Sequence, residues 1–396
     1  MGDISVKVDV DAVIVGGGIA GLWTLARLRD QGFNAVLLED DALGAGQTRY
    51  SQGIIHGGTK YALTGKLTAS SEAVSAMPSI WRACHAGKGE VDLRKAVMIS
   101  DAHYLWSTTS LTSKITGFFA SRVMRARTTA LKPQQRPAIF QHRDFRGSIY
   151  RLDEPVFDCI SVLQALAEPS MRSIVAVRKD SIRPQVSSLL VETTDGQGCE
   201  LNFSKLVLMA GQGNQSLLSA AGLQKPVMQL RPLKMVMMRG GLVNKVFAHC
   251  MGAGINPRVT ITSHTDDDGN IVWYLGGQLA EDGVNRTDEE QIARAQRELA
   301  ELIPWQKLDT AQWGVLDIDR AEVRHADGHR PDTFYATQQG NIITAWPTKL
   351  ALAPLLAQQI VDYCSTVEKT DNELPAWPAP PFAKYPWCEP ARWNGV

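Results

Sequence analysis

The sequence predicts an α+β fold, in which a parallel, helix-covered sheet of the Rossmann type contains an inserted antiparallel sheet. Short apolar runs at 12–15, 35–39 and 205–209 lack alternation, as strands buried on both faces do. A helical pattern follows the first of these runs and another covers 349–363. Between these ends, 227–240 and 258–280 have the β-rich, hairpin-like pattern of an antiparallel sheet.

The remaining elements follow in chain order. The first strand leads into a glycine-rich turn and a helix with apolar residues on one face, and Gly32 is expected to end that helix. Strands and loops are predicted at 95–107 and 137–152, with a last strand at 341–345. Further helices are predicted at 71–84, 159–168 and 287–302. The segment after Pro375 is rich in proline and tryptophan, which favours an extended tail packed on a surface.

This order predicts a nucleotide-binding domain assembled from separated segments. Its segments are 1–84, 153–225 and 322–374, while 85–152 and 226–321 form a substrate or cap domain, and 375–396 form the tail. A length of 396 residues fits two or three domains.

Composition excludes several classes of function. The formal net charge is zero, so no bulk field favours nucleic acid. We expect no signal peptide and no membrane span, because neither a basic start with an apolar run nor about 18 consecutive apolar residues is found. The six cysteines include no CxxC pair, which argues against a zinc or iron–sulfur site and predicts no metal. We therefore expect a cytoplasmic protein.

A dinucleotide fingerprint stands at the first strand–helix junction. Gly16, Gly18 and Gly21 give G-x-G-x-x-G, which provides a tight turn, close approach of a pyrophosphate and close packing of helix on strand. The helix start at Ile19 and Ala20 offers N–H groups to phosphate. The second strand ends in Glu39, followed by Asp40, where a carboxylate accepts hydrogen bonds from a ribose diol.

The segment from Gly44 to Tyr61 favours FAD over NAD. It is rich in glycine and hydroxyl side chains directly after the strand that ends in the acid, so it can follow a long cofactor. NAD enzymes usually return to a helix at this point. The residues of this segment predicted to contact the cofactor are Thr48, Ser51, Gln52, Gly53 and Ile55.

The same segment resembles the D-amino-acid oxidase superfamily of FAD-dependent oxidoreductases. Residues 51–61, a serine-containing loop followed by Gly-Ile-Ile-His-Gly-Gly-x-basic-Tyr, are most similar to the glycerol-3-phosphate dehydrogenase and L-2-hydroxyglutarate dehydrogenase branches. Residues 206–214, 273–277 and 341–354 resemble other family segments, so matches span nearly the whole chain but are dense only in 11–61. Where the family often has a glycine-rich loop, this chain has Trp-Pro-Thr-Lys at 346–349. The resemblance implies FAD contacts from Val177, Ala210, Gly211, Trp346, Thr348, Lys349 and Leu350.

The resemblance also implies the residues of the chemistry. His56 is the candidate base, because a histidine titrates near neutrality; the alternatives are a simple hydrogen bond to flavin or backbone, and covalent attachment of the flavin. Lys60 and Tyr61 follow as substrate contacts, although a surface charge is the alternative for Lys60, and lysine replaces the arginine of the glycerol-3-phosphate branch. Arg320, with Arg324 as second choice, is the candidate clamp for a substrate anion, against the alternative of an ordinary ion pair.

These features predict an enzyme that removes hydride from a C–H bond next to an alcohol or amine of a small, anionic substrate. The electron acceptor is O2 or a quinone. The basic, aromatic segment 111–125 either contacts a membrane surface or packs against protein. The alternatives are an amino-acid or amine oxidase of the same fold, an NAD-linked dehydrogenase and a non-catalytic flavin-binding protein.

Overall fold

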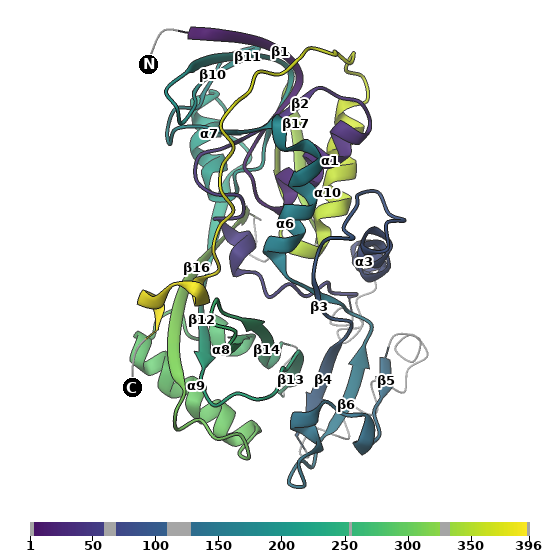
Figure 1. Cartoon of the computed structure of the whole chain (residues 1–396), viewed down its shortest axis with the longest axis vertical. Coiled ribbons are helices and arrows are strands. Elements are labelled where there is room, and N and C mark those ends of the chain that lie inside the picture. Colours follow the sequence, from purple (N-terminus) through teal and green to yellow (C-terminus); the bar gives the residue numbers. More distant parts are fainter. Residues whose placement is uncertain (1–3, 59–68, 109–127, 253–255, 325–332, 394–396) are drawn as a thin grey trace.

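The computed structural model describes residues 4–58, 69–108, 128–252, 256–324 and 333–393. Within these ranges the strands form two eight-stranded sheets and one two-stranded pair. The two large sheets occupy opposite ends of the molecule (Figure 1). The predicted α+β fold is confirmed, whereas the domain boundaries stay a prediction. The segment 111–125 lies outside the described residues.

The first sheet has a parallel centre. Its strands run in the order β17-β18-β11-β1-β2-β8, with every neighbouring pair parallel except β17 and β18, and β10 and β9 continue antiparallel from β11. The strands are β1 (Ile4–Val15), β2 (Ala35–Glu39), β8 (Ile174–Ala176), β9 (Arg183–Pro184), β10 (Ser188–Glu192), β11 (Gly198–Leu208), β17 (Tyr335–Gln339) and β18 (Ile342–Trp346).

The first strand is longer than its predicted core at 12–15. Residues 12–15 pair with both β11 and β2 and are fully buried, as the unbroken apolar run predicts. Residues before Ala12 pair with β11 alone, and there Val8 and Val10 are buried while Lys7 and Asp9 are exposed. The first half of the strand therefore alternates, because only part of it is covered on both sides.

Helices cover the first sheet on both faces. One core joins α1, α6, α10 and part of α3 to the sheet, and a second core on the other face includes Leu217 and Leu218 of α7. Figure 1 shows α1, α6 and α10 grouped on one side of the strands. The helices of the described ranges are α1 (Ile19–Asp30), α3 (Ala69–His85), α6 (Cys159–Ala167), α7 (Asn214–Ala220), α8 (Gln278–Glu281), α9 (Asp288–Leu302) and α10 (Ala353–Cys364). None of them is long and apolar enough to cross a membrane.

The second sheet is mainly antiparallel and has the order β16-β12-β15-β14-β13-β4-β6-β5. Its longest ladder pairs 228–239 with 312–323, and Figure 1 shows these two strands reaching from the second sheet toward the first. Helix α9 packs on this sheet through Ala295 and Leu299. The strands are β4 (His103–Ser107), β5 (Thr128–Ala130), β6 (Ser148–Leu152), β12 (Met228–Arg239), β13 (Ala248–Met251), β14 (Pro257–Thr265), β15 (Ile271–Gly276) and β16 (Gln312–Val323).

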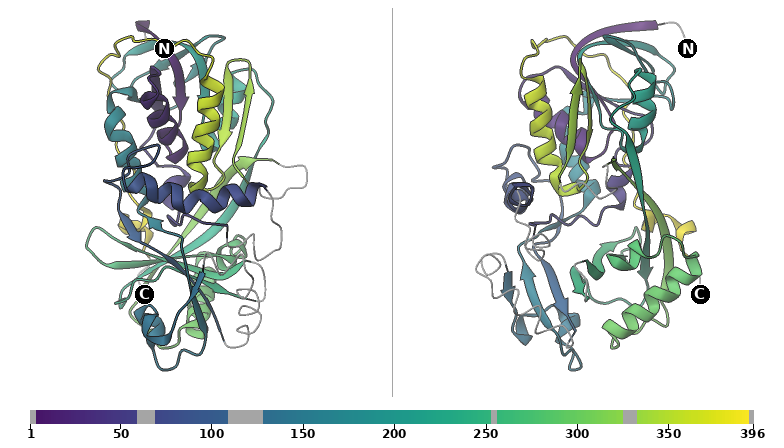
Figure 2. Two further views of the ribbon diagram at one scale, coloured as in Figure 1. Left: turned by 90° about the vertical axis from the view of Figure 1, so that its right-hand side faces the viewer. Right: turned by 180° about the vertical axis from the view of Figure 1, so that it is seen from behind.

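Two further features connect the ends of the molecule. The pair β3 (Met98–Ser100) and β7 (Val156–Phe157) lies between the sheets, and Figure 2 shows α3 crossing the same region. The tail after Pro375 is largely extended, but it is more deeply packed than a surface segment. Its Trp387 is fully buried and stacks against His264 of β14 with ring centroids 4.3 Å apart.

Candidate active site

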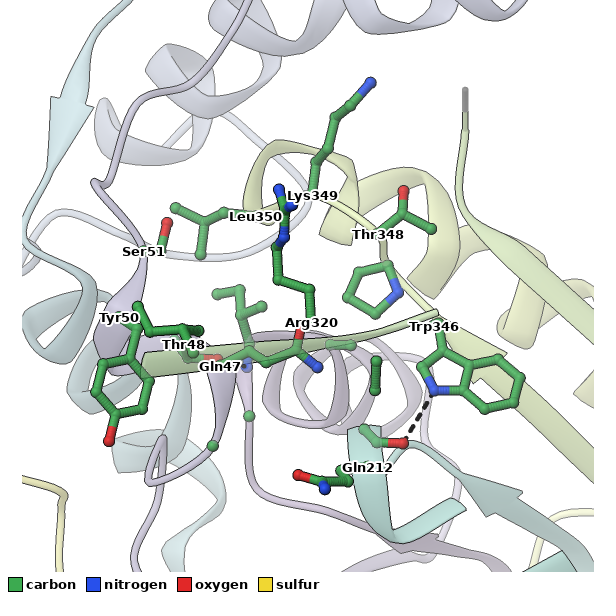
Figure 3. Close-up of a pocket in the computed structure, with 18 of the residues that line it drawn as sticks. Gln47, Thr48, Tyr50, Ser51, Gln212, Arg320, Trp346, Thr348, Lys349 and Leu350 are labelled. Atoms are coloured by element: carbon green, nitrogen blue, oxygen red, sulfur yellow. Dashed lines mark hydrogen bonds between the residues drawn. The ribbon is translucent and has the colours of Figure 1, made fainter. Parts of the chain in front are cut away.

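A cavity of about 1220 Å³ is lined by residues of both large sheets and of the loops between them. This volume exceeds the roughly 300–1,000 Å³ of sites for drug-sized ligands, so the cavity can hold a long cofactor together with a substrate. Figure 3 shows one part of its wall, where Thr48, Arg320 and Trp346 come from three distant segments of the chain.

The glycine turn forms one end of the cavity. Gly16 has φ of +115°, and a Cβ at Gly21 would overlap the carbonyl oxygen of Gly16, so the helix can approach the turn only without side chains at these positions. A Cβ at Gly18 would instead meet the Thr48 hydroxyl at 3.2 Å. The N–H groups of Gly18 and Ala20 have no acceptor among the described residues. These observations fit a pyrophosphate at the start of α1.

Glu39 lies at the end of β2, beside this turn. Its two carboxylate oxygens accept hydrogen bonds from the N–H groups of Gly17, at 2.5 Å, and Asp41, at 3.0 Å. Burial raises the pKa of Glu39 to about 7, against the lowering effect of these two hydrogen bonds. A ribose diol would supply further donors to the ionised carboxylate.

The loop after β2 follows the cavity wall. The Thr48 hydroxyl accepts a hydrogen bond from the N–H of Ile19 at 3.1 Å, which ties the loop to the start of α1. Farther along, the Gln52 side chain donates to the carbonyl of Tyr274 at 3.1 Å and so connects the loop with the second sheet. The loop therefore reaches from the phosphate end of the cavity to its substrate end.

The opposite wall is built by the loops after β11 and β18. The indole N–H of Trp346 donates to the carbonyl of Gly211 at 2.9 Å, which is the dashed line of Figure 3. Thr348 has φ of +58°, a strained value for a β-branched residue, and its hydroxyl donates to the carbonyl of Thr333 at 2.9 Å. Where the family often has a glycine-rich loop, this chain therefore has Thr348 in the left-handed backbone conformation, and Thr348 lines the cavity.

Most of the predicted cofactor residues line this one cavity. They are Gly16, Gly18, Ile19, Ala20, Glu39, Asp40, Thr48, Ser51, Gln52, Ala210, Gly211, Trp346, Thr348, Lys349 and Leu350. Gly53, Ile55 and Val177 lie behind the wall. A Cβ at Gly53 would overlap the carbonyl of Phe157, Ile55 is fully buried, and the Val177 N–H donates to the carbonyl of Glu39 at 2.9 Å. These three support the wall from behind.

The two arginines differ in position. Arg320, on β16, lines the cavity, whereas Arg324 follows the end of β16 and is exposed outside it. Nε of Arg320 donates to the carbonyl of Arg231 at 3.5 Å. Of the nearby acids, Glu322 pairs with Arg231 at 2.8 Å and Asp317 with Lys234 at 3.0 Å. Lys60 and Tyr61 lie outside the described residues.

His56 belongs to a group of polar residues at the substrate end, which we call the histidine cluster: His56, His103, Glu154 and His249. Nδ1 of His56 lies 3.2 Å from Oε2 of Glu154, and the N–H of Gly57 donates to Oε1 of the same carboxylate at 2.9 Å. Burial alone would raise the pKa of Glu154, but the hydrogen bond and charge of His56 and the Gly57 N–H outweigh it and lower this pKa.

The other two histidines extend the histidine cluster into the second sheet. The ring of His249 on β13 stacks on His56 with centroids 5.6 Å apart, and its Nδ1 is hydrogen bonded to the Thr260 hydroxyl at 2.8 Å. His103 on β4 is fully buried, 4.1 Å from the His249 ring, and no described residue is hydrogen bonded to either of its ring nitrogens. Burial first, and then repulsion from the other histidines, lower the pKa of His103 well below its ordinary value.

Three members of the histidine cluster are spaced as the ligands of a metal ion could be. One potential donor atom each from His56, Glu154 and His249 lies within 4.8 Å of the others. The hydrogen bonds given above already engage both oxygens of Glu154 and one nitrogen of each of these histidines. The prediction of no metal site was made from the spacing of the cysteines and did not take this group into account.

Glu154 and His249 are the functional candidates that the sequence analysis missed. Glu154 stands in a short loop between β6 and β7, and His249 stands in a four-residue strand, so neither has a local motif around it. Only the pairing of β13 with β4 and the path of the loop bring them to His56. Tertiary contact is thus the signal that identifies them.

Comparison with known proteins identifies the cofactor that this cavity fits. A family model described as FAD-dependent oxidoreductase, named DAO, matches residues 11–353. The chain belongs to this family. FAD is its cofactor, and the chain is an FAD-dependent oxidoreductase, so the alternatives of an NAD-linked dehydrogenase and a non-catalytic protein are not retained.

Individual relatives agree with the family assignment. A protein of Pseudomonas aeruginosa, described as a probable FAD-dependent oxidoreductase, PA4991, is 46% identical over 384 residues, covering 95% of this chain and 97% of the relative. Its crystal structure matches with a TM-score of 0.84 at 42% identity, covering 96% of this chain and 98% of that one.

Two more distant structures share the DAO fold. Glycine oxidase from Geobacillus kaustophilus has a TM-score of 0.65 at 15% identity, covering 92% and 97% of the two chains. L-alpha-glycerophosphate oxidase from Mycoplasma pneumoniae, solved with FAD bound, has a TM-score of 0.63 at 12% identity, covering 95% and 100%. At this identity the likeness concerns the fold alone.

Proposed function

We propose that this DAO-family enzyme oxidises a small anionic substrate at a C–H bond next to a hydroxyl group, such as a 2-hydroxy acid or a polyol phosphate. The observation that carries the proposal is that one cavity brings together the cofactor-binding loops, the imidazole of His56 and the guanidinium of Arg320. A base and an anion clamp in the same space are what such an oxidation requires from the protein.

Arg320 binds the substrate anion. Its guanidinium offers a planar set of donors that suits a carboxylate or phosphate. Lys349 lines the same cavity and adds a second positive charge. The predicted substrate contacts of Lys60 and Tyr61 remain part of the proposal.

His56 takes the proton. Bound FAD would supply the acceptor for the hydride of the substrate C–H bond, and the substrate hydroxyl must lose a proton for the carbonyl to form. Because Nδ1 of His56 faces Glu154, the ring nitrogen available to that proton is Nε2, which has no hydrogen bond to another described residue. The side chain of His56 is 42% exposed, so the ring reaches the cavity.

An amino-acid substrate is the second candidate, because the cavity wall also carries acids. Glu281 and Asp319 line it together with Arg320, and a zwitterion needs both signs of charge. The Glu281 carboxylate accepts a hydrogen bond from the Asn256 amide at 3.0 Å, which fixes its position. In this case His56 takes a proton from the substrate amine.

The decisive experiment is anaerobic reduction of the bound flavin by a panel of 2-hydroxy acids, polyol phosphates and amino acids, followed by stopped-flow absorbance. Reduction by one of the first two classes supports the proposal, whereas reduction by amino acids alone supports the second candidate. Reoxidation of the reduced enzyme by O2 or by a soluble quinone then distinguishes the two acceptors that we propose for a cytoplasmic enzyme.

Variants test the two roles. His56→Ala is expected to slow flavin reduction by roughly two to four powers of ten, the usual effect of a positioned acid–base group, with FAD still bound. His142→Ala, at an exposed histidine, is the matched control. Reduction at the parent rate in His56→Ala would exclude this residue as the base.

Arg320→Ala is expected to weaken substrate binding by roughly 10–100-fold, since hydrogen bonds between charged groups contribute about 1.5–3 kcal/mol. Arg320→Lys restores only part of this, because the fork geometry is lost. Arg324→Ala, outside the cavity, is the control. Normal binding by Arg320→Ala would argue for a neutral or cationic substrate.

The flavin attachment has its own test. We propose noncovalent FAD, because His56 is engaged by Glu154. Acid precipitation should leave a colourless pellet, and a yellow pellet with flavin on His56 would assign that residue to attachment instead.

A further inference from the structure

Glu154 has a role that the proposed chemistry does not yet use. Its carboxylate is almost completely buried, with the side chain 4% exposed, and it lies directly behind the proposed base. Charged carboxylates are rarely buried unless paired and hydrogen bonded. Both of its oxygens accept hydrogen bonds from one short piece of chain, through the ring of His56 and the N–H of Gly57.

We propose that Glu154 is the positioning residue of a histidine–carboxylate pair, which fixes the Nδ1–H tautomer of His56, presents Nε2 to the cavity and stabilises the proton that His56 takes up. The inference rests on the proposed function only in taking His56 as the base.

The tautomer follows from the hydrogen bonds. An ionised carboxylate can only accept, so the hydrogen between Glu154 and His56 must belong to Nδ1. In the neutral ring the other nitrogen, Nε2, then carries a lone pair. Because the same carboxylate also holds the Gly57 N–H at 2.9 Å, it fixes the main chain beside the ring as well as the ring. A rotation of His56 would break a charge-assisted hydrogen bond inside the protein.

The histidine cluster disfavours more than one positive charge. His103 is fully buried, and no described carboxylate is hydrogen bonded to it. His249 has the neutral Thr260 hydroxyl at its Nδ1. Three imidazoles in contact repel one another once more than one of them is charged. Nδ1 of His56 lies 3.2 Å from the Glu154 carboxylate, so this carboxylate can stabilise a proton that His56 takes from substrate.

This arrangement matters most after proton transfer. When Nε2 takes the substrate proton the ring becomes an imidazolium, and the carboxylate behind it stabilises that charge by direct attraction. A carboxylate in this position serves a catalytic histidine both by orienting the ring and by stabilising its charged form. Glu154 does not touch the substrate, so its contribution passes entirely through His56.

The first test needs no substrate and no substitution at Glu154. Protein labelled with ¹⁵N in its histidines gives ring-nitrogen NMR signals, and the His56 signals are assigned by their loss in His56→Ala. At a pH where His56 is neutral, we expect a protonated Nδ1 and an unprotonated Nε2 in the parent protein. An Nε2–H tautomer in the parent would overturn the proposal whatever the variants do.

The second test is Glu154→Gln in the holoenzyme, with FAD content checked by absorbance. The amide keeps the shape and can still accept from Gly57 but loses the charge, so the His56 signals should change toward a mixture of tautomers. Flavin reduction should slow by at least about tenfold and by no more than in His56→Ala. The pH profile of its flavin reduction should also differ from that of the parent enzyme, because the imidazolium formed at His56 loses its facing carboxylate.

Two further variants distinguish an effect of the Glu154 charge on His56 from a general effect of removing a buried carboxylate. Glu154→Asp keeps the charge at a shorter reach and should restore part of the rate and of the pH profile. Glu298→Gln removes another buried carboxylate, 2% exposed and paired with Arg258 and Arg294 away from the cavity, and should leave the His56 signals and the profile unchanged.

The outcomes distinguish this inference from the proposed function. If His56→Ala reduces flavin at the parent rate, the base assignment fails. If His56→Ala is slow but Glu154→Gln keeps the parent rate, pH profile and tautomer, the positioning role of Glu154 fails and His56 acts without it.

Discussion

Glu39 is predicted to make the apoprotein less stable as the pH rises. Its pKa is raised by burial from 4.5 to about 7. Each pKa unit corresponds to about 1.4 kcal/mol, so ionising this buried group costs the folded apoprotein about 3 kcal/mol relative to the unfolded chain. Because the pKa is raised in the folded state, the apoprotein has its full stability below pH 4.5. It loses about 3 kcal/mol of this stability as the pH rises through 7.

Glu39→Gln is the perturbation that isolates this effect. A glutamine does not titrate, and the hydrogen bonds that it changes at Gly17 and Asp41 shift stability by an amount that does not depend on the pH. The free energy of unfolding of the variant, minus that of the parent, should therefore increase by about 3 kcal/mol between pH 4 and pH 8. Urea denaturation of both apoproteins over this range, followed by tryptophan fluorescence, measures the difference.

The exposed Glu373→Gln serves as the control and should follow the parent curve. If the free energies of unfolding of Glu39→Gln and the parent change in parallel with pH, the reasoning is refuted. Ionisation of Glu39 would then not destabilise the folded apoprotein. The same substitution should weaken FAD binding by roughly 10–100-fold at pH 8, since a charged acceptor for the ribose is lost. Titration of the apoprotein with FAD measures this.

Three further predictions concern the glycine turn and the tail. Gly18→Val should leave a folded apoprotein that does not retain FAD, because its Cβ meets only the Thr48 hydroxyl, at 3.2 Å, but occupies the pyrophosphate position; circular dichroism and bound flavin absorbance check this. Gly21→Val should instead destabilise the apoprotein itself, by at least about 2 kcal/mol, since its Cβ would overlap the carbonyl of Gly16, and an unchanged urea midpoint would contradict it. Trp387→Ala should lower the free energy of unfolding by about 3–5 kcal/mol, as for other fully buried tryptophans, and a loss below 1 kcal/mol would show that the tail does not clamp the second sheet.

The sequence predicted the fold most accurately where a feature depends on one short segment of the chain. The glycines at 16, 18 and 21 and the acid at Glu39 need only a strand, a turn and a helix in succession, and the structure has all three. The early start of β1 at Ile4 was missed, although Val6, Val8 and Val10 alternate with Lys7 and Asp9. The prediction looked for strands buried on both faces, and this half of the strand pairs on one side only.

The candidate site was predicted only on the side supplied by the cofactor-binding segments. His56 was found from the loop that follows the acid, but its partners Glu154 and His249 come from parts of the chain about 100 and 190 residues away. No periodicity or spacing in one segment records a contact that depends on how β13 pairs with β4. Arg320 was preferred over Arg324 by resemblance, and this role stays a prediction; in the structure Arg320 lines the cavity and Arg324 is exposed outside it.

The way in which the chain enters and leaves the substrate end has a consequence for how such enzymes diversify. One excursion leaves near Met98 and returns at Phe157, its strand partner, and another leaves at Val227 and returns at Arg324, whose N–H donates to the Val227 carbonyl at 2.8 Å. Each excursion therefore begins and ends at neighbouring points, so its interior can be lengthened or exchanged without moving the strands that hold FAD. Grafting both excursions between family members should transfer substrate preference as a unit. Glu154 travels with the first excursion while His56 stays behind, so a successful graft must bring a carboxylate to the same place.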